Sequence, residues 1–525
     1  MNFRISSFCA GLFAVFALLL TTCVEEPSAT PINVVEASIA DVHTAVLTGA
    51  TTCRMVVQSH LDRIDIYEDQ INAITVLNPN ALTRADEIDA AVASGSDLGA
   101  LFCVPMLVKD NFDTHDMVTT GGSIALMESV PPDDAFMVRR IREEGAIVIA
   151  KTNMAEWAFS PRQSVSSSFD TTRNAYALDR VPAGSSGGTA SGVAVSFGLI
   201  GLGSDTGNSI RGPSSHLALV GIRSTIGLTS RDGIIPLHFD RDIAGPMGRT
   251  VEDVARVFNV VAGYDPADPY TEDGRNRKED DYTVFLDSSG LEGVRLGVLT
   301  QLVDTEDADT AVIRVFEDAV ADLMRLGAEV VDFNFDLAPA RRPNMRCSRF
   351  RYDVGQYLAS LGDRAPIRDV AEVLETGQYS DYIEGTLRGR VSQPLDLHPV
   401  DFDPPCMDYF DHEGRQGLRA ELVAAMDDAG IDAVVYPSWT NPPAHIDRGD
   451  EEYRGDNSQR VAPATGLPAI TVPMGYSYGD LPAGLQILGR AYAEGVLFKL
   501  AYAYEQGTHH RHPPSGFPEL ALTDN

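Results

Sequence analysis

The chain has 525 residues, of which 44% are hydrophobic and 22% charged, so it can bury a sizeable folded core. Its 75 acidic residues outnumber the 41 lysines and arginines, which gives a formal net charge of −34. This excess argues against a nucleic-acid-binding protein, because phosphate contacts need lysine and arginine, and against a basic membrane-binding face. We interpret the acidic surface as a solvated, solubilising face or as an adaptation to a salty habitat.

The N-terminus predicts export. Residues 1–22 combine a basic start with an apolar run at 8–20, which is too short to span a bilayer comfortably and is typical of a signal peptide. Leu20-Thr21-Thr22-Cys23 resembles a bacterial lipobox, although threonine replaces the usual small residue before the cysteine. We therefore predict a periplasmic protein or a lipoprotein that touches the membrane only through an anchor at Cys23. The residue after Cys23 is not aspartate, which slightly favours the outer membrane.

Helices and strands are predicted to alternate over one large domain at 51–515, between a tether and N-terminal segment at 23–50 and a tail at 516–525. The first helix begins near residue 51 or 52, since Val57, Leu61 and Ile64 recur on one face. Further helices are expected over 81–93, 135–144, 188–197, 251–262 and 310–326, and strands over 104–108, 147–150, 199–203, 294–299 and 329–333. This order predicts an α/β fold with a mixed central β-sheet covered by helices on both faces.

Two clusters of serine and glycine carry the chemistry. They are Gly184-Ser185-Ser186-Gly187-Gly188 and Asp205-Thr206-Gly207-Asn208-Ser209. A serine nucleophile needs an exposed hydroxyl, a base and preorganised N–H donors for the oxyanion. Because glycine permits left-handed backbone and close approach to a substrate, we predict a turn at 206–209 whose N–H groups point at one oxygen.

Lys109 is the expected base. It follows the apolar run at 101–108, which predicts a buried strand, and burial lowers the pKa of a lysine from about 10.4. The alternative is an ion pair with Asp110 or Asp113, which would raise that pKa instead. Lys151 also follows an apolar run and is interpreted as structural.

Together these motifs resemble the amidase signature family of Ser-cisSer-Lys amide hydrolases. The resemblance covers roughly residues 50–515 and continues at 150–156, 220–227, 465–470 and 482–490. It implies that Lys109 is the catalytic lysine, Ser185 the bridging serine and Ser209 the nucleophile. It further implies an α/β/α sandwich and an oxyanion hole made by the backbone N–H groups of Thr206, Gly207, Asn208 and Ser209.

The sequence departs from the family at two positions near these serines. Asn208 stands where a second glycine is usual, and Ala183 stands where glycine is common. Asparagine tolerates left-handed backbone, so the turn is expected to survive. These departures bear on the substrate range rather than on the chemistry.

Other polar residues have competing interpretations. Asp205 and Arg211 flank the nucleophile and are expected to form a buried ion pair that holds the turn, the alternative being a direct catalytic role. His216 is an alternative base. The histidine cluster at 509–512 is interpreted as solvated, and the absence of a compact metal-binding pattern leaves no metal or organic cofactor expected.

Cysteines and aromatic residues give weaker signals. An exported chain permits disulfides, and Cys347 with Cys406 is a conceivable pair, whereas Cys103 is expected to be buried and free. Trp157 and Phe159 line an acyl pocket or pack in the core. The segment at 335–415 lacks motifs, and a substrate-facing insertion is expected there.

The sequence therefore predicts an exported amidase that cleaves a small-molecule or short-peptide carboxamide through a serine acyl-enzyme. Fatty, aryl and peptide amides, esters and carbamates all remain candidate substrates. Two alternatives remain: the glutaminase-type subunit of a tRNA-dependent amidotransferase, and a lipoprotein that binds amides or peptides without catalysis.

Overall fold

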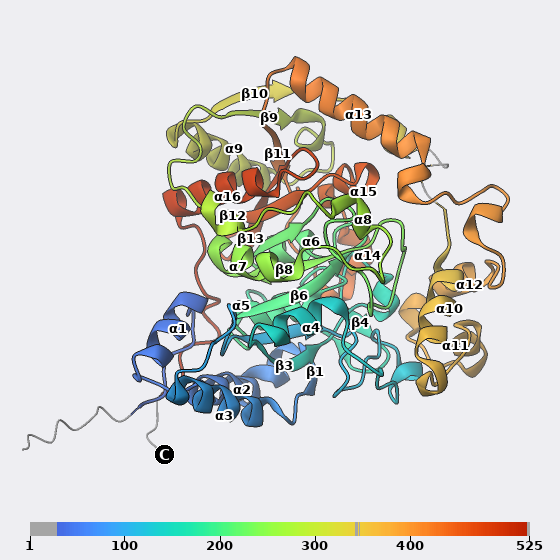
Figure 1. The fold of residues 1–525 in the computed structure, drawn as a ribbon. Coiled ribbons are helices and arrows are strands. Elements are labelled where there is room, and N and C mark those ends of the chain that lie inside the picture. Colours follow the sequence, from blue (N-terminus) through green and yellow to red (C-terminus); the bar gives the residue numbers. More distant parts are fainter. Residues whose placement is uncertain (1–28, 342–344, 346, 522–525) are drawn as a thin grey trace, which may run out of the picture.

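A computed structural model describes residues 29–341, 345 and 347–521, and in this part of the chain one mixed sheet of eleven strands forms the centre (Figure 1). The predicted signal peptide, the lipobox and Cys23 lie outside the described residues. None of the helices in the described ranges has the length and apolar character needed to cross a bilayer.

The strand order of the sheet is β1 (Ile74–Leu77), β3 (Ile147–Thr152), β2 (Pro105–Lys109), β6 (Ile200–Asp205), β8 (Ile243–Gly248), β7 (Val220–Arg223), β12 (Ala469–Ser477), β13 (Leu481–Leu488), β11 (Ala433–Pro437), β9 (Arg295–Leu299) and β10 (Glu329–Phe333). Strand β2 runs parallel to β3 and β6, and β9 runs parallel to β10 and β11. The remaining neighbours are antiparallel. A separate small hairpin joins β4 (Val165–Ser166) to β5 (Asp170–Thr171).

The first eight helices of the described chain are α1 (Ile39–Leu47), α2 (Cys53–Ile71), α3 (Ala81–Ser94), α4 (Phe136–Glu143), α5 (Gly187–Ala194), α6 (Arg211–His216), α7 (Val251–Val261) and α8 (Thr271–Gly274). Those that follow are α9 (Thr310–Arg325), α10 (Phe350–Ser360), α11 (Ala371–Thr376), α12 (Glu384–Val391), α13 (Glu413–Asp428), α14 (Gly449–Glu452), α15 (Ala462–Thr465) and α16 (Glu494–Thr508). Single turns of 3-10 helix connect several of them.

Helices cover both faces of the sheet, as the sequence predicts. On one face of β6, a Cβ at Gly201 would lie 2.4 Å from Thr189 of α5, so glycine lets this helix approach closely. The preceding residue of the strand, Ile200, faces the other way. There Ile200 lies beside Gly248 of β8, and a Cβ at Gly248 would meet Val254 of α7 at 3.0 Å.

Most predicted elements are present with shifts of a few residues. Thr52 caps α2 by accepting a hydrogen bond from the Met55 N–H, which confirms the predicted start of this helix. The β9–α9–β10 unit is parallel, as its spacing implies. Helix α5 ends at Ala194 rather than at 197, and Ser196 beyond it has a left-handed backbone with φ of +59°.

Two disulfides are present among the described cysteines. Cys347 pairs with Cys406, as the sequence allowed. The prediction that Cys103 is free is wrong: it is fully buried but is bonded to Cys53, at the start of α2. Sequence alone misses this pair because 50 positions separate the two residues and only the packing of α2 against β2 brings them together.

Helices α10, α11 and α12 form a lobe at the margin of the molecule, seen at the right of Figure 1. A small core of its own, which includes Phe350, Val354 and Leu387, packs against Trp157 and Ile235. The lobe lies within the segment 335–415, where the sequence predicts an insertion.

Candidate active site

Lys109 and Ser204 come together because their strands are parallel neighbours. Strand β2 ends at Lys109 and β6 carries Ser204 near its end, so both side chains lie at the carboxyl edge of the sheet. The Lys109 side-chain nitrogen Nζ lies 2.7 Å from Ser185 Oγ and 2.8 Å from Ser204 Oγ. Asn111 also donates to Ser204 Oγ at 3.0 Å, which fixes this hydroxyl beside the lysine.

Burial sets the protonation of the lysine. Lys109 is 0% exposed, and loss of hydration lowers its pKa to about 7, although the carboxylates of Asp242 and Asp205 act in the opposite direction. The amine is therefore available as a base near neutral pH.

The ion pair considered as an alternative for Lys109 is absent among the described residues. Asp110 instead lies 3.2 Å from Lys151 Nζ, and Asp113 accepts a hydrogen bond of 2.7 Å from the Tyr357 hydroxyl. Lys151 also donates to the Thr119 hydroxyl at 2.8 Å, so its structural interpretation is confirmed.

The first serine cluster needs its glycines for close packing. A Cβ at Gly184 would lie 2.4 Å from the Ser160 carbonyl oxygen, and one at Gly188 would lie 2.3 Å from that of Asn153. The Gly184–Ser185 peptide bond is cis. Ser186 donates to the Ser204 carbonyl at 3.3 Å, so Ser185 is the serine of this pair that contacts Lys109.

Ser209 lies in the turn between β6 and α6. Its side chain is nearly buried, and its hydroxyl donates a long hydrogen bond of 3.4 Å to Asn208 Oδ1. No hydrogen bond joins the Ser209 and Ser185 hydroxyls within the described residues. In the same part of the chain, none of the backbone N–H groups at 206–209 donates to a protein oxygen, so these donors are available to a ligand.

The predicted turn at 206–209 is present, but it does not use the left-handed backbone that its glycine and asparagine permit. Neither Gly207 nor Asn208 has a positive φ, whereas Ala183, beside the first cluster, has a φ of +65°. The neighbouring Gln459 side chain leaves little room for a larger residue at Gly207, because a Cβ there would lie 3.2 Å from Gln459 Oε1. The Asn208 amide donates to the Pro161 carbonyl at 3.3 Å and so ties the turn to the opposite loop.

The turn is held by a buried ion-pair network. Asp205 accepts from Arg211 Nε at 3.0 Å and from Arg223 Nη1 at 2.9 Å, and all three side chains are 0% exposed. Burial alone would raise the pKa of Asp205, but the two guanidinium groups outweigh it and hold the pKa below its usual range. Arg211 also donates to the Gly207 carbonyl at 2.7 Å, which confirms the expected structural ion pair.

His216 lies apart from the serines. Its ring packs against Trp439 at 4.4 Å, and burial lowers its pKa to about 3. No hydrogen bond links it to Ser185 or Ser209 in the described structure, which disfavours it as the base. In the late histidine cluster, His509 and His512 are exposed.

Metal-binding side-chain types gather once in the described ranges, at His115, Asp116 and Asp134. Arg142 already pairs with both carboxylates there, at 2.7 and 3.5 Å. The negative charge of both carboxylates is therefore compensated by one guanidinium group.

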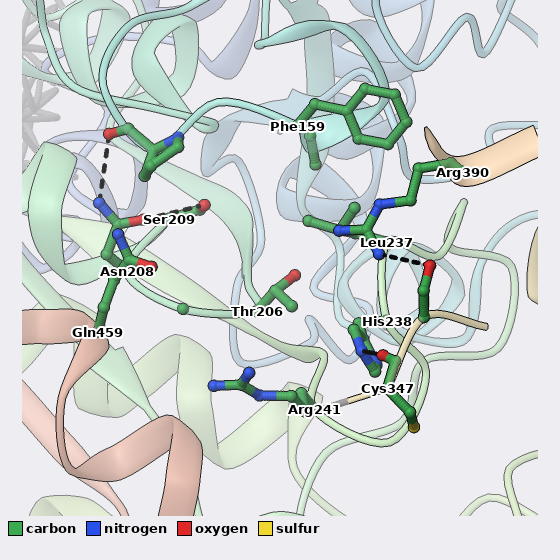
Figure 2. A pocket seen from close by; sticks show the side chains of 14 residues that line it. Phe159, Thr206, Asn208, Ser209, Leu237, His238, Arg241, Cys347, Arg390 and Gln459 are labelled. Atoms are coloured by element: carbon green, nitrogen blue, oxygen red, sulfur yellow. Dashed lines mark hydrogen bonds between the residues drawn. The ribbon is translucent and has the colours of Figure 1, made fainter. Parts of the chain in front are cut away.

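Ser209 opens into a cavity of about 400 Å³ (Figure 2). Its walls are formed by Ala158, Phe159, Pro161, Thr206, Gly207, Asn208, Ser209, Leu237, His238, Arg241, Cys347, Ser348, Arg390 and Gln459. Phe159 thus lines the pocket, whereas Trp157 is buried in the small core. Three wall residues come from the segment 335–415, as expected of a substrate-facing insertion.

Comparison with known proteins identifies the family. The family model described as Amidase matches residues 55–498. The chain belongs to the amidase family. Its members hydrolyse carbon–nitrogen bonds, and the mixed sheet with helices on both faces is the amidase-signature fold.

Individual relatives differ in function. The chain is 32% identical to one of the subunits of the glutamyl-tRNA(Gln) amidotransferase of Microcystis aeruginosa, over 91% of this chain and 99% of that one. It is 33% identical to the native peptide amidase of Stenotrophomonas maltophilia, with a TM-score of 0.79 over 91% and 98% of the two chains. An amidase family protein from Bacillus anthracis is 28% identical, with a TM-score of 0.80 over 92% and 93%.

Several residues of this amidase site escape sequence reasoning. Ser204 directly follows the predicted strand at 199–203 and precedes Asp205. A polar residue at the end of a buried strand was the available signal, and the structure shows that its hydroxyl contacts Lys109. Arg390 and His238 carry no local signal, because only tertiary packing brings their segments to the pocket.

Proposed function

We propose that this protein is an amidase that hydrolyses a carboxamide through a serine acyl-enzyme. The observation that carries the proposal is the 2.7 Å contact between Lys109 Nζ and Ser185 Oγ, in a site where burial lowers the lysine pKa to about 7. A neutral amine accepts a proton from a hydroxyl, and a buried ammonium cannot.

The same serine and lysine side chains act in both halves of the reaction, acylation of the enzyme and hydrolysis of the acyl-enzyme. Ser209 Oγ attacks the amide carbonyl, while its proton passes through the Ser185 hydroxyl to the Lys109 amine. Backbone N–H groups at 206–209 bind the oxyanion, and the relay then returns the proton to the leaving amine. Water hydrolyses the acyl-enzyme by the same route and releases the acid and free Ser209.

We also propose export and lipid attachment at Cys23. The apolar run at 8–20 and the lipobox-like residues support it. The two disulfides add independent support, since such bonds persist in oxidising compartments and are rare in the cytoplasm.

The alternative of a glutaminase-type component of an amidotransferase draws support from the 32% identity to the Microcystis aeruginosa protein over nearly the whole chain. It requires a cytoplasmic protein, so the disulfides and the N-terminus weigh against it. A binding protein without catalysis would have no need of a desolvated lysine in contact with a serine.

The decisive experiment is covalent trapping with a fluorophosphonate followed by peptide mass spectrometry. We expect one adduct, on Ser209, and turnover of at least one member of a panel of aryl, fatty and peptide amides. Ser209→Ala and Ser185→Ala should each abolish turnover, whereas the matched control Ser186→Ala should retain much more. An adduct elsewhere, or equal losses for Ser185→Ala and Ser186→Ala, would contradict the assignment.

A further inference from the structure

Asp242 lies next to the turn that carries Ser209. Strands β6 and β8 are antiparallel neighbours, and Asp205 of β6 is the register partner of Ile243 of β8. The next residues outward, Thr206 and Asp242, therefore face each other, and the Thr206 hydroxyl donates a hydrogen bond to Asp242 Oδ1. A side chain that directly precedes β8 thus holds the first residue of the turn.

The same carboxylate also holds another wall of the pocket. Asp242 Oδ2 accepts hydrogen bonds of 2.9 Å from the backbone N–H groups of both Leu237 and His238. These two residues and Thr206 all line the cavity at Ser209, and Figure 2 shows Thr206 between Ser209 and the other two. Because hydrogen bonds to a carboxylate are roughly twice as strong as those between neutral groups, Asp242 ties the two walls together.

Asp242 also acts on the proposed base. Burial lowers the pKa of Lys109 to about 7, and the Asp242 carboxylate acts against this shift because it favours the ammonium form. Asp205 acts in the same direction, but its carboxylate is already held by Arg211 and Arg223. Loss of the Asp242 charge should therefore make the ammonium group easier to deprotonate, so that the amine serves as a base at a lower pH.

The surroundings of Asp242 keep it away from a substrate. In the described structure it does not line the cavity at Ser209 but lines a separate void of about 10 Å³, beside Ser204 and Arg231. A void of this size has room for no more than about one water molecule, so no substrate group reaches the carboxylate there. The charge of Arg231 is compensated by Asp268, whose Oδ2 accepts a hydrogen bond from Arg231 Nε at 2.8 Å.

We propose that Asp242 is a positioning residue of the reaction, which holds Thr206 and the N–H groups of the turn in place and supplies a negative charge near Lys109. The inference rests on the proposed function and deepens it. The N–H groups at 206–209 stabilise an oxyanion only if the turn keeps its position, because hydrogen bonds weaken steeply with poor geometry. Asp242 thus acts on the oxyanion hole and on the base through its neighbours rather than through contact with the substrate.

The test measures the rate of fluorophosphonate labelling of Ser209 between pH 5 and 9. Asp242→Asn keeps the size of the side chain and removes its charge. We expect the midpoint of the pH–rate profile to move to lower pH by about one unit, since a negative charge near the ammonium group is lost. The plateau rate above the midpoint should fall roughly tenfold, because the turn loses its charge-assisted hydrogen bonds.

Further variants separate the two effects. Thr206→Val removes the hydroxyl that donates to Asp242 and leaves the charge in place, so the plateau rate should fall roughly tenfold while the midpoint stays where it is. Thr206→Ser, which retains a hydroxyl, should restore part of the plateau rate. Asp240→Asn is the matched control, because this buried carboxylate of the same segment pairs with Arg415 at 2.6 Å. Its loss should leave the midpoint at the wild-type pH.

Failure of this inference is distinguishable from failure of the proposed function. A wild-type midpoint in Asp242→Asn, or an equal shift in Asp240→Asn, would overturn the role of the Asp242 charge. A wild-type plateau rate in Thr206→Val would overturn the hold of Asp242 on the turn, and this result stands even if circular dichroism shows that Asp242→Asn does not fold. Absence of labelling at Ser209 in the wild-type protein would contradict the proposed function itself.

Discussion

Lys109 Nζ and Ser185 Oγ lie 2.7 Å apart although 76 positions separate the two residues in the chain. The contact forms because β2 delivers the lysine to the same sheet edge at which the glycine-rich turn before α5 presents the serine. Since the lysine is buried, its protonation state governs the proposed relay, and pH becomes the most direct probe of the site.

Acylation should rise with pH through the pKa of Lys109. Below about pH 7 the ammonium form of Lys109 predominates, and it cannot accept a proton. Above this pH the neutral amine predominates and can accept one. The rate should therefore increase about tenfold per unit well below pH 7 and level off above about pH 8. Fluorophosphonate labelling rates between pH 5 and 9 would measure this. Lys109→Ala should cut the rate severely and flatten the profile, whereas His216→Ala should preserve it. A pH–rate profile that disappears in His216→Ala and persists in Lys109→Ala would refute the mechanism.

Ser204→Ala should shift the same profile to lower pH. The Ser204 hydroxyl accepts a hydrogen bond from Lys109 and so favours the ammonium form. Without this acceptor, the lysine pKa should fall further, and kcat should drop roughly tenfold because one orienting hydrogen bond is lost. Ser186→Ala, which leaves the lysine contacts in place, is the control. A midpoint that Ser204→Ala does not move would show that this hydroxyl has no influence on the base.

The two disulfides should have separable effects. They join residues 50 and 59 positions apart, so removal of either should cost a similar ~2–4 kcal/mol and lower the melting temperature comparably. Of the four cysteines, Cys347 is the one that lines the pocket. The double variant Cys347→Ser/Cys406→Ser should therefore raise KM, and Cys53→Ser/Cys103→Ser should not. Steady-state kinetics with the best amide would measure this, and equal KM values would argue against a role for this bond in shaping the pocket.

Asp205→Asn should destabilise the protein strongly. It leaves Arg211 and Arg223 buried without their counter-charge, a loss of about 3–5 kcal/mol for a buried network. Urea unfolding would be compared with that of Asp427→Asn, whose exposed pair with Arg490 should contribute no more than about 1 kcal/mol. Because the folded-state pKa of Asp205 is lowered, its contribution is present above about pH 4 and disappears as the pH falls. Similar small losses in the two variants would contradict this view of the turn.

Cys23→Ser should release the protein from the membrane fraction. A lipid chain on this residue would be the only membrane contact expected for the chain, so its loss leaves a freely exported enzyme. Cell fractionation and mass spectrometry of the mature N-terminus would measure the outcome. Continued membrane association, or a mature N-terminus well past residue 23, would exclude the anchor.

Much of the fold follows from local sequence. The Thr52 cap, the β9–α9–β10 unit and the strand that ends at Lys109 are all encoded in neighbouring residues, because hydrophobic periodicity and capping act over a few positions. The glycine-rich clusters likewise indicate close packing. Their backbone conformation is not predictable in this way: Gly207 and Asn208 avoid the left-handed region, whereas Ala183 adopts it.

What the sequence by itself determined was the α/β fold. It also predicted Lys109, Ser185 and Ser209 as the catalytic set, since each residue stands in a distinctive short motif. Tertiary structure alone decided that Cys103 bonds to Cys53 and that Arg390 lines the pocket. These contacts join distant segments, and their stability depends on how helices pack against the sheet rather than on any local preference. The charge of a pocket likewise depends on which distant segments form its walls. Although this chain is acidic overall, no carboxylate of the described residues lines the cavity at Ser209.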